Sequence, residues 1–140
     1  MDCRPTQWPG HFCFMGHFRA LRAWQEARRL AVLSSHGIEK LPLHERPGLG
    51  DQWRRAAYSV ALNLAEGATR RSLKEFRRFV SIARGSLDEL DSIFEIVDGL
   101  AYLDAEQLTA LKSARDNCSR MVSGLLRKLD AMIDDLRSGN

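Results

Sequence analysis

The sequence predicts an all-α protein, an up-down antiparallel four-helix bundle. Four segments repeat their apolar residues at intervals of three and four, which is the period of an α-helix. No segment alternates polar and apolar residues as a half-buried strand does. Glycine or proline follows the segments and the connections are short, so consecutive helices are expected to lie antiparallel.

Length and composition limit the class of protein. The 140 residues suit one domain, and apolar residues make up an ordinary 44% of the chain. No apolar run approaches the ~20 residues that cross a bilayer, and the beginning of the chain lacks a signal-peptide pattern. The three cysteines make no disulfide framework, and Cys118, on an apolar helical face, is expected to be a buried thiol. We therefore expect a cytoplasmic protein without a membrane partner.

Residues 1–17 differ from the rest, because proline and glycine interrupt them and no helical period is present. We expect a disordered leader there, with Met15 as an alternative start because periodic sequence begins directly after it. The leader contains four residues of types that bind metals, but their spacing matches no zinc motif, so neither a metal site nor a cofactor is predicted. These residues are Cys3, His11, Cys13 and His17.

The first helix is predicted from about residue 18 to residue 35, where apolar residues recur at helical spacing. We expect it to end near Gly37, because glycine favours a helix stop and Pro42 blocks continuation. Residues 42–50 contain two prolines and two glycines and are expected to form a loop.

The second helix is predicted from residue 50 or 51 to residue 66. Asp51 is a suitable N-cap, since its carboxylate can accept a hydrogen bond from a free amide of the first turn. Gly67 is expected at the C′ position that follows the last turn, where a positive φ is needed.

The third helix is predicted to open at Ser72, which forms a capping-box pattern with Glu75. The fourth helix is predicted to follow Asp104 as its N-cap, and its apolar residues have the heptad spacing of a bundle helix. The four-helix bundle therefore occupies residues 18–137, and residues 138–140 form a tail.

Charge is uneven along the chain, although the net charge is only +3. Residues 69–85 hold six basic residues and one acid, whereas residues 86–111 hold seven acids and neither Lys nor Arg. The fourth helix carries Lys112 and Arg115 early and three aspartates late. Antiparallel packing of the third and fourth helices therefore predicts that unlike charges face each other.

A basic stripe is predicted on the third helix. It consists of Arg70, Lys74, Arg77 and Arg84 on one helical face, with Arg71 and Arg78 beside that face. Such a stripe suits a phosphate backbone. Phe76 and Phe79 stand among the cations but belong to the core by their period, so no aromatic residue is expected to stack on bases and the binding is expected to carry little sequence information. The alternative is a solvated face or ion pairs with neighbouring subunits.

Polar side chains occur where a simple bundle helix carries none, at Asn63 and Glu66. Buried polar groups need partners, so a structural polar network is predicted within the bundle or across a subunit interface. Its members are Arg54, Arg55, Asn63, Glu66, Ser86 and Glu89. A catalytic acid–base pair of Glu66 and Glu89 is less favoured, because no His, Lys or Ser with a nucleophilic context stands nearby in the sequence.

Several motifs occur together in an order that resembles one known family. They are Phe18-Arg-Ala-Leu-Arg-Ala-Trp-Gln25, Gln52-x-Arg-Arg-Ala56, Asn63-x-Ala-Glu-Gly67 and Ala83-Arg-Gly-Ser-Leu-x-Glu-Leu90. Residues 18–103 closely resemble the bacterial four-helix-bundle family, also called the 23S rRNA intervening-sequence proteins. That family is related to the accessory variability determinant of diversity-generating retroelements. Ala61 departs from the pattern, since the family often has proline there.

The resemblance implies a homopentameric ring of four-helix protomers without known catalysis. It also implies nucleic-acid partners, because the retroelement relatives bind a reverse transcriptase and nucleic acid. We therefore expect a non-enzymatic, homo-oligomeric adaptor that binds RNA, DNA or a nucleic-acid enzyme through the basic stripe. The first alternative is a pure protein-interaction scaffold that uses the stripe in self-assembly. The least favoured alternative is a hydrolase that uses Glu66 and Glu89.

Overall fold

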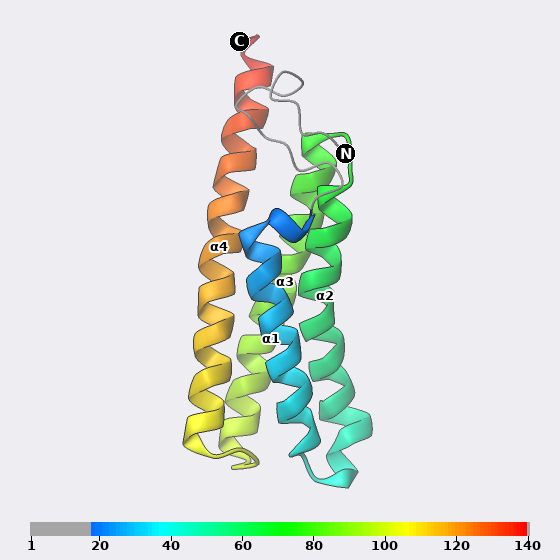
Figure 1. Cartoon of the computed structure of the whole chain (residues 1–140), viewed down its shortest axis with the longest axis vertical. Helices are drawn as coiled ribbons and strands as arrows, with labels where there is room; N and C mark the ends of the chain where they lie inside the picture. The colour runs from blue at the N-terminus through cyan, green and yellow to red at the C-terminus, as the bar shows by residue number, and fades with distance from the viewer. Residues whose placement is uncertain (1–17, 140) are drawn as a thin grey trace.

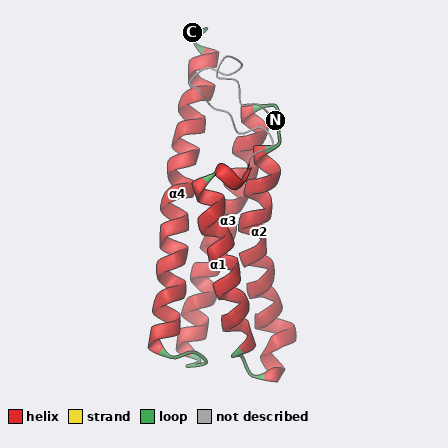
Figure 2. Cartoon of the chain, in the orientation of Figure 1, coloured by secondary structure: helices red, strands yellow, loops and turns green. Residues whose placement is uncertain are grey.

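The computed structural model describes residues 18–139, and within them it contains helices and turns but no strand (Figure 2). Its long helices are α1 (Arg22–Glu39), α2 (Asp51–Ala68), α3 (Leu73–Gly99) and α4 (Ala105–Arg137). They run alternately up and down along one axis (Figure 1), which confirms the predicted all-α, four-helix fold. The predicted leader, with Met15 and its four cysteine and histidine residues, lies outside the described residues, as does Asn140.

The core follows the bundle axis, because each long helix turns one apolar stripe inward. Trp53 on α2 and Phe94 on α3 are fully buried and meet edge to face, with ring centroids 5.5 Å apart. Cys118 on α4 is buried as predicted, and its Sγ lies 3.8 Å from the carbonyl oxygen of Ala23 on α1. Burial raises the pKa of the Cys118 thiol to about 12.

The first long helix continues past its predicted end, through Gly37 to Glu39. Gly37 lies inside α1, where a larger residue has no room. A Cβ at this position would stand 2.6 Å from the end of the Trp53 ring. The glycine therefore serves close packing of α1 on α2, and the prediction that it ends the helix is wrong.

The connection between α1 and α2 is helical, so the predicted loop over residues 42–50 is also wrong. After the non-helical residues 40–42 it consists of a 3-10 turn, η2 (Leu43–Glu45), and a π turn, η3 (Arg46–Gly50), that leads directly into α2. The residue before Asp51 already has helical φ and ψ, so Asp51 is not an N-cap. Its carboxylate instead accepts a hydrogen bond from Arg54 at 3.1 Å.

Gly67 is an interior residue of α2 and not the predicted C′ residue, because the helix continues to Ala68. The described residues with φ in the left-handed region are Ala101, at 57°, and Gly139, at 78°. Position 67 requires glycine for a different reason. A Cβ there would stand 2.8 Å from the Cβ of Phe79 on α3, so the two helices are in very close contact at this level.

Side-chain caps fix where the last two helices begin. Ser72 Oγ accepts a hydrogen bond from the Glu75 amide at 3.3 Å, although the return bond of the predicted box is not found among the described residues. At α4 the box is complete. Asp104 accepts from the Gln107 amide at 2.8 Å, and the Gln107 side chain accepts from the Asp104 amide at 3.3 Å.

Ion pairs join α3 and α4 as the charge pattern predicted. Arg77 contacts Asp130 near the described chain ends, and Lys112 contacts Glu95 at 3.0 Å near the α3–α4 turn. Between them, Arg115 on α4 donates a hydrogen bond to a backbone carbonyl of α3. Ion pairs this exposed contribute little stability, but they favour the antiparallel register over others.

Candidate functional site

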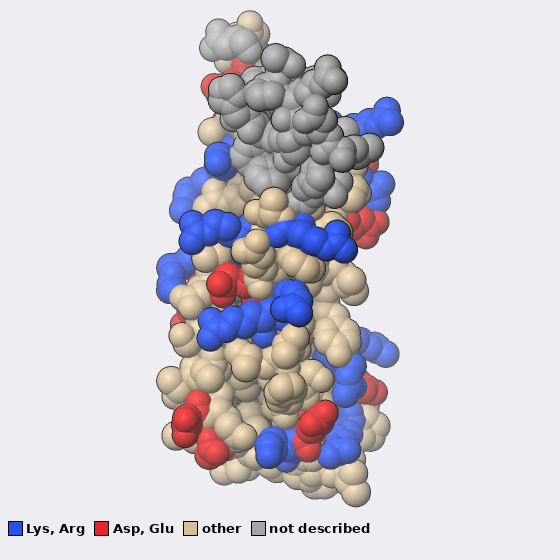
Figure 3. Space-filling model, in the orientation of Figure 1, with Lys and Arg blue, Asp and Glu red and all other residues tan. Residues whose placement is uncertain are grey.

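Charge separates in space along the bundle. The half nearer the described chain ends (Figure 1) comprises residues 18–24, 64–84 and 120–139 and holds 12 Lys and Arg against 5 Asp and Glu. The other half, residues 25–63 and 85–119, holds 8 Lys and Arg against 12 Asp and Glu. Figure 3 shows Lys and Arg side chains crossing the middle of one face in bands. The positive half attracts anions at long range.

The cations predicted on the third helix divide into two groups. Arg71, Lys74, Arg78 and Arg84 are exposed, and within the described part of the chain none of them makes an ion pair. We call these four residues the basic cluster. Arg78 also stacks over the Phe79 ring, 4.6 Å from its centroid, which limits the freedom of its guanidinium. The cluster follows the first half of α3 and the turn before it.

Arg70 and Arg77, by contrast, are held by carboxylates. Arg70 Nη2 lies 2.7 Å from Glu66 Oε1. Arg77 Nε lies 2.5 Å from Asp130 Oδ1, across the seam between α3 and α4. The hydrogen bond and charge of Asp130 raise the pKa of Arg77, and the hydrogen bond from Arg77 lowers the pKa of Asp130. The predicted stripe is therefore divided, because two of its cations have partners inside the chain.

Two members of the predicted polar network meet through a third residue. Asn63 Nδ2 donates to the backbone oxygen of Ser59 at 2.8 Å and lies 2.9 Å from Ser59 Oγ. Ser86 on α3 donates from Oγ to Ser59 Oγ at 2.8 Å. This small cluster joins α2 to α3 near the surface and fixes their register. Ser59 was not among the residues predicted to form the network.

The remaining members do not join this cluster within the bundle. Arg54 pairs with Asp51 and Glu66 pairs with Arg70, while Arg55 and Glu89 are exposed. Gly67 lies beside Phe79, and Glu89 is ten residues further along α3, which is about 15 Å of helix. Glu66 and Glu89 are therefore too far apart to act as an acid–base pair on one bond, and this contradicts the geometry that the hydrolase alternative requires.

An apolar strip lies on the outside of α2 and α3, and its residues Leu62, Ile82 and Ile96 were not predicted. Tyr58 is 40% exposed, Leu62 65%, Ile82 41% and Ile96 48%. The Ser59–Ser86 bond sets the register, so Leu62 and Ile82 lie one turn above it on adjacent helices. One turn below it, Arg55 and Glu89 occupy equivalent levels. The sequence does indicate such a strip, because these apolar residues fall outside the inward-facing stripe of each helix.

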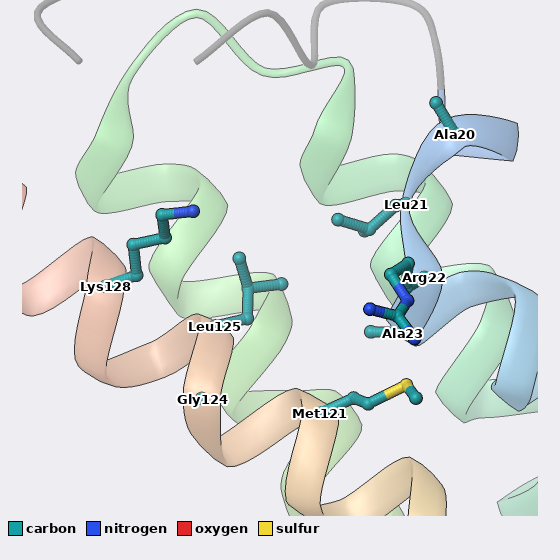
Figure 4. A pocket seen from close by; sticks show the side chains of 8 residues that line it. All are labelled: Ala20, Leu21, Arg22, Ala23, Met121, Gly124, Leu125 and Lys128. Atoms are coloured by element: carbon teal, nitrogen blue, oxygen red, sulfur yellow. The ribbon is translucent and has the colours of Figure 1, made fainter. Parts of the chain in front are cut away.

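Grooves flank α4 in the positive half. One, of about 490 Å³, separates the beginning of α1 from α4 and is mostly apolar, with Arg22 on the α1 side and Lys128 on the α4 side (Figure 4). Another, of about 390 Å³, lies between the beginning of α3 and the end of α4 and includes two residues of the basic cluster. The described residues hold no group of three or more His, Cys, Asp and Glu that is placed to bind a metal.

The fold and its surfaces define a class: a four-helix-bundle protein with a positive half and an outer apolar strip. Within the described residues, no helix has both the length and the apolarity needed to cross a membrane. The model of the 23S rRNA-intervening sequence protein family matches residues 19–124, which covers α1 to α3 and the first part of α4. The chain belongs to this family. A comparison with curated proteins finds no match.

Proposed function

We propose that the protein is a non-enzymatic, homo-oligomeric adaptor of the cytoplasm that binds the phosphate backbone of nucleic acid through the basic cluster. The observation that carries this proposal is the exposure of Arg71, Lys74, Arg78 and Arg84 without a carboxylate partner among the described residues. Unpaired cations on one helix favour a polyanion, since each phosphate that they neutralise releases a condensed counterion. The excess of bases in the surrounding half of the bundle supports the same conclusion.

The arrangement favours backbone contacts over base recognition. Lys74 and Arg84 are separated by about 15 Å along α3, which is long enough to follow several phosphates of a strand. Phe76 and Phe79 are buried, so they are not available to stack on bases. Affinity should therefore depend strongly on salt and weakly on sequence.

A double charge reversal tests this function. Lys74→Glu with Arg84→Glu should weaken binding of a labelled RNA or DNA oligonucleotide for all sequences alike, as measured by fluorescence anisotropy at low salt. The matched control is Arg28→Glu with Lys40→Glu, which changes the net charge equally at exposed positions in the other half of the bundle. Equal losses in both variants would show that net charge alone drives binding and would contradict a role for the basic cluster.

We also propose that subunits associate through the outer face of α2 and α3, in a ring of five as the family resemblance suggests. Exposed Leu62 and Ile82 supply apolar area, and charged residues of the predicted polar network lie on the same side of these helices. A subunit interface would bury Arg55 and Glu89 together with the Ser59–Ser86 cluster, which would give the network the partners it lacks in one chain.

Light scattering at micromolar concentration tests the assembly and should give a mass near five protomers. Leu62→Asp with Ile82→Asp should yield monomers, because two buried charges without partners oppose association. Leu43→Asp is the control, since Leu43 is 77% exposed but lies on η2, away from this face. If the basic-cluster reversal also yields monomers, and the wild type binds no nucleic acid, the protein is instead a scaffold that uses its cations for self-assembly.

A further inference from the structure

The groove between the beginning of α3 and the end of α4 combines cations with apolar surface. Its volume is about 390 Å³. Three of its lining residues are basic (Arg71, Lys74 and Arg137), and three are apolar (Leu73, Ile133 and Leu136). Ser72 completes the lining, and among these described residues there is no Asp or Glu. Such a lining suits a ligand that carries both a negative charge and an apolar part.

Of the α4 carboxylates close to the groove residues in sequence, Asp134 and Asp135 are exposed and do not line the groove, and Asp130 is already engaged. Asp130 lies about one turn before Ile133 and bonds to Arg77, so its charge is largely compensated outside the groove. The groove is charged at its edges, and its apolar part is accessible to a ligand. Leu136 is 51% exposed, whereas Leu73 and Ile133 are each only 8% exposed and form the floor. A ligand can therefore cover Leu136 without displacing the core.

We propose that this groove holds one nucleotide of single-stranded nucleic acid. This inference rests on the proposed function and makes it specific. The phosphate lies among Arg71, Lys74 and Arg137, and the sugar and base cover Leu136 and the floor. A duplex keeps its bases stacked inside, so it can offer phosphates to the cations but nothing to the apolar surface. The volume lies within the range of small-ligand sites, about 300–1,000 Å³.

The cations beyond the groove favour a strand over a flat anionic surface. Lys74 belongs both to the groove and to the basic cluster, and Arg78 and Arg84 continue from it along α3. Cations spread along a helix beyond one groove can neutralise successive phosphates of a strand. An anionic lipid surface would instead favour a broad basic patch around an exposed apolar face.

Anisotropy with a thymidine oligonucleotide and with a duplex of equal length tests the assignment. The wild type should bind the single strand more tightly at the same salt concentration. Arg137→Gln should weaken single-strand binding by about tenfold, as expected for one lost charge-assisted contact. Leu136→Ser should weaken single-strand binding several-fold and leave duplex binding unchanged. Arg28→Gln is the matched charge control and should bind both like the wild type. Thermal melting should show that all three variants are folded.

The outcomes separate failure of the groove from failure of the proposed function. If neither nucleic acid binds at low salt, the proposed function fails and the groove assignment fails with it. If both bind, and the two groove variants bind them as the wild type does, only the groove assignment is overturned. Tight binding to phosphatidylserine vesicles without binding to the oligonucleotide would identify a lipid headgroup as the source of the phosphate and overturn the assignment. Inorganic phosphate at millimolar concentration is a further competitor. If it displaces the labelled strand as effectively as an unlabelled oligonucleotide does, the groove assignment is also overturned, because the apolar surface would then contribute nothing to binding.

Discussion

Replacement of Gly67 by alanine tests the closest helix contact in the bundle. The added methyl group would stand 2.8 Å from the Cβ of Phe79 and 3.1 Å from Cδ1 of Phe76. The Phe79 Cβ is attached directly to the α3 backbone, so it cannot move away without moving the helix. This contact holds the α2–α3 turn, and therefore also Arg71 and the groove next to it. We expect Gly67→Ala to destabilise the protein even though alanine is the better helix former.

The magnitude follows from two opposing effects. Alanine in place of an interior helical glycine gains about 1 kcal/mol in helix propensity. Overpacking of a tight contact costs about 1–3 kcal/mol. The net loss for Gly67→Ala is therefore about 0–2 kcal/mol. Gly124→Ala is the control, because its Cβ would meet only the tip of Arg127, at an ordinary 3.8 Å. That variant should gain stability, so the two should differ by about 1–3 kcal/mol.

Thermal unfolding by circular dichroism measures this difference when both variants are melted at one protein concentration. For a domain of this size, 1 kcal/mol corresponds to about 4 °C in Tm, so Gly67→Ala should melt about 4–12 °C below Gly124→Ala. Equal melting temperatures would show that α2 and α3 can separate at no cost. That result would refute the inference that position 67 requires glycine for close approach.

Two other predictions concern single side chains. Cys118 should resist thiol labelling at neutral pH until the protein unfolds, because its pKa of about 12 leaves almost no thiolate. Mass spectrometry of the Cys118 peptide measures the extent of labelling. Rapid labelling of the folded protein would contradict the burial of this thiol. Asp130→Asn should strengthen nucleic-acid binding by releasing Arg77, and the log–log salt slope measured with duplex DNA should become steeper by up to about 0.9 if Arg77 then meets a phosphate. Because Arg77 lowers the pKa of Asp130, the carboxylate is charged at neutral pH, and the ion pair is lost only as the pH falls through that lowered value. Unchanged affinity in Asp130→Asn would place Arg77 outside the interface.

The sequence was sufficient for the fold class, because amphipathic period and helix caps are local properties. Asp104 was recognised as an N-cap from its own neighbours, and the structure confirms it. The roles of Gly37 and Gly67 could not be found in this way. Each glycine is required by a ring on another helix, and the sequence around the glycine does not show which ring will lie opposite. Both were therefore interpreted as helix stops, although both lie inside helices.

The candidate site was predicted only in part, again because the sequence does not show which residues of different helices lie opposite each other. Basic residues on α3 can be counted along the sequence, but which of them remain unpaired depends on the register of α3 against α4. Arg77 lies opposite Asp130, whereas Lys74 adjoins the groove that also includes Arg137. The helical period of the core describes only the inward stripe of each helix, so exposed apolar residues such as Leu62 fall outside that prediction.

The salt dependence of oligonucleotide binding tests the central claim most directly. Anisotropy titrations of the wild type and of Lys74→Glu with Arg84→Glu, at a series of salt concentrations, give the slope of log affinity against log salt. If the basic cluster contacts phosphates, the wild-type affinity falls steeply with salt, by about 0.7 in slope for each phosphate on a single strand. The double variant should then show a slope smaller by about 1.4, for two lost contacts. Identical slopes, or no binding by the wild type at the lowest salt, would contradict nucleic-acid recognition by this protein through α3.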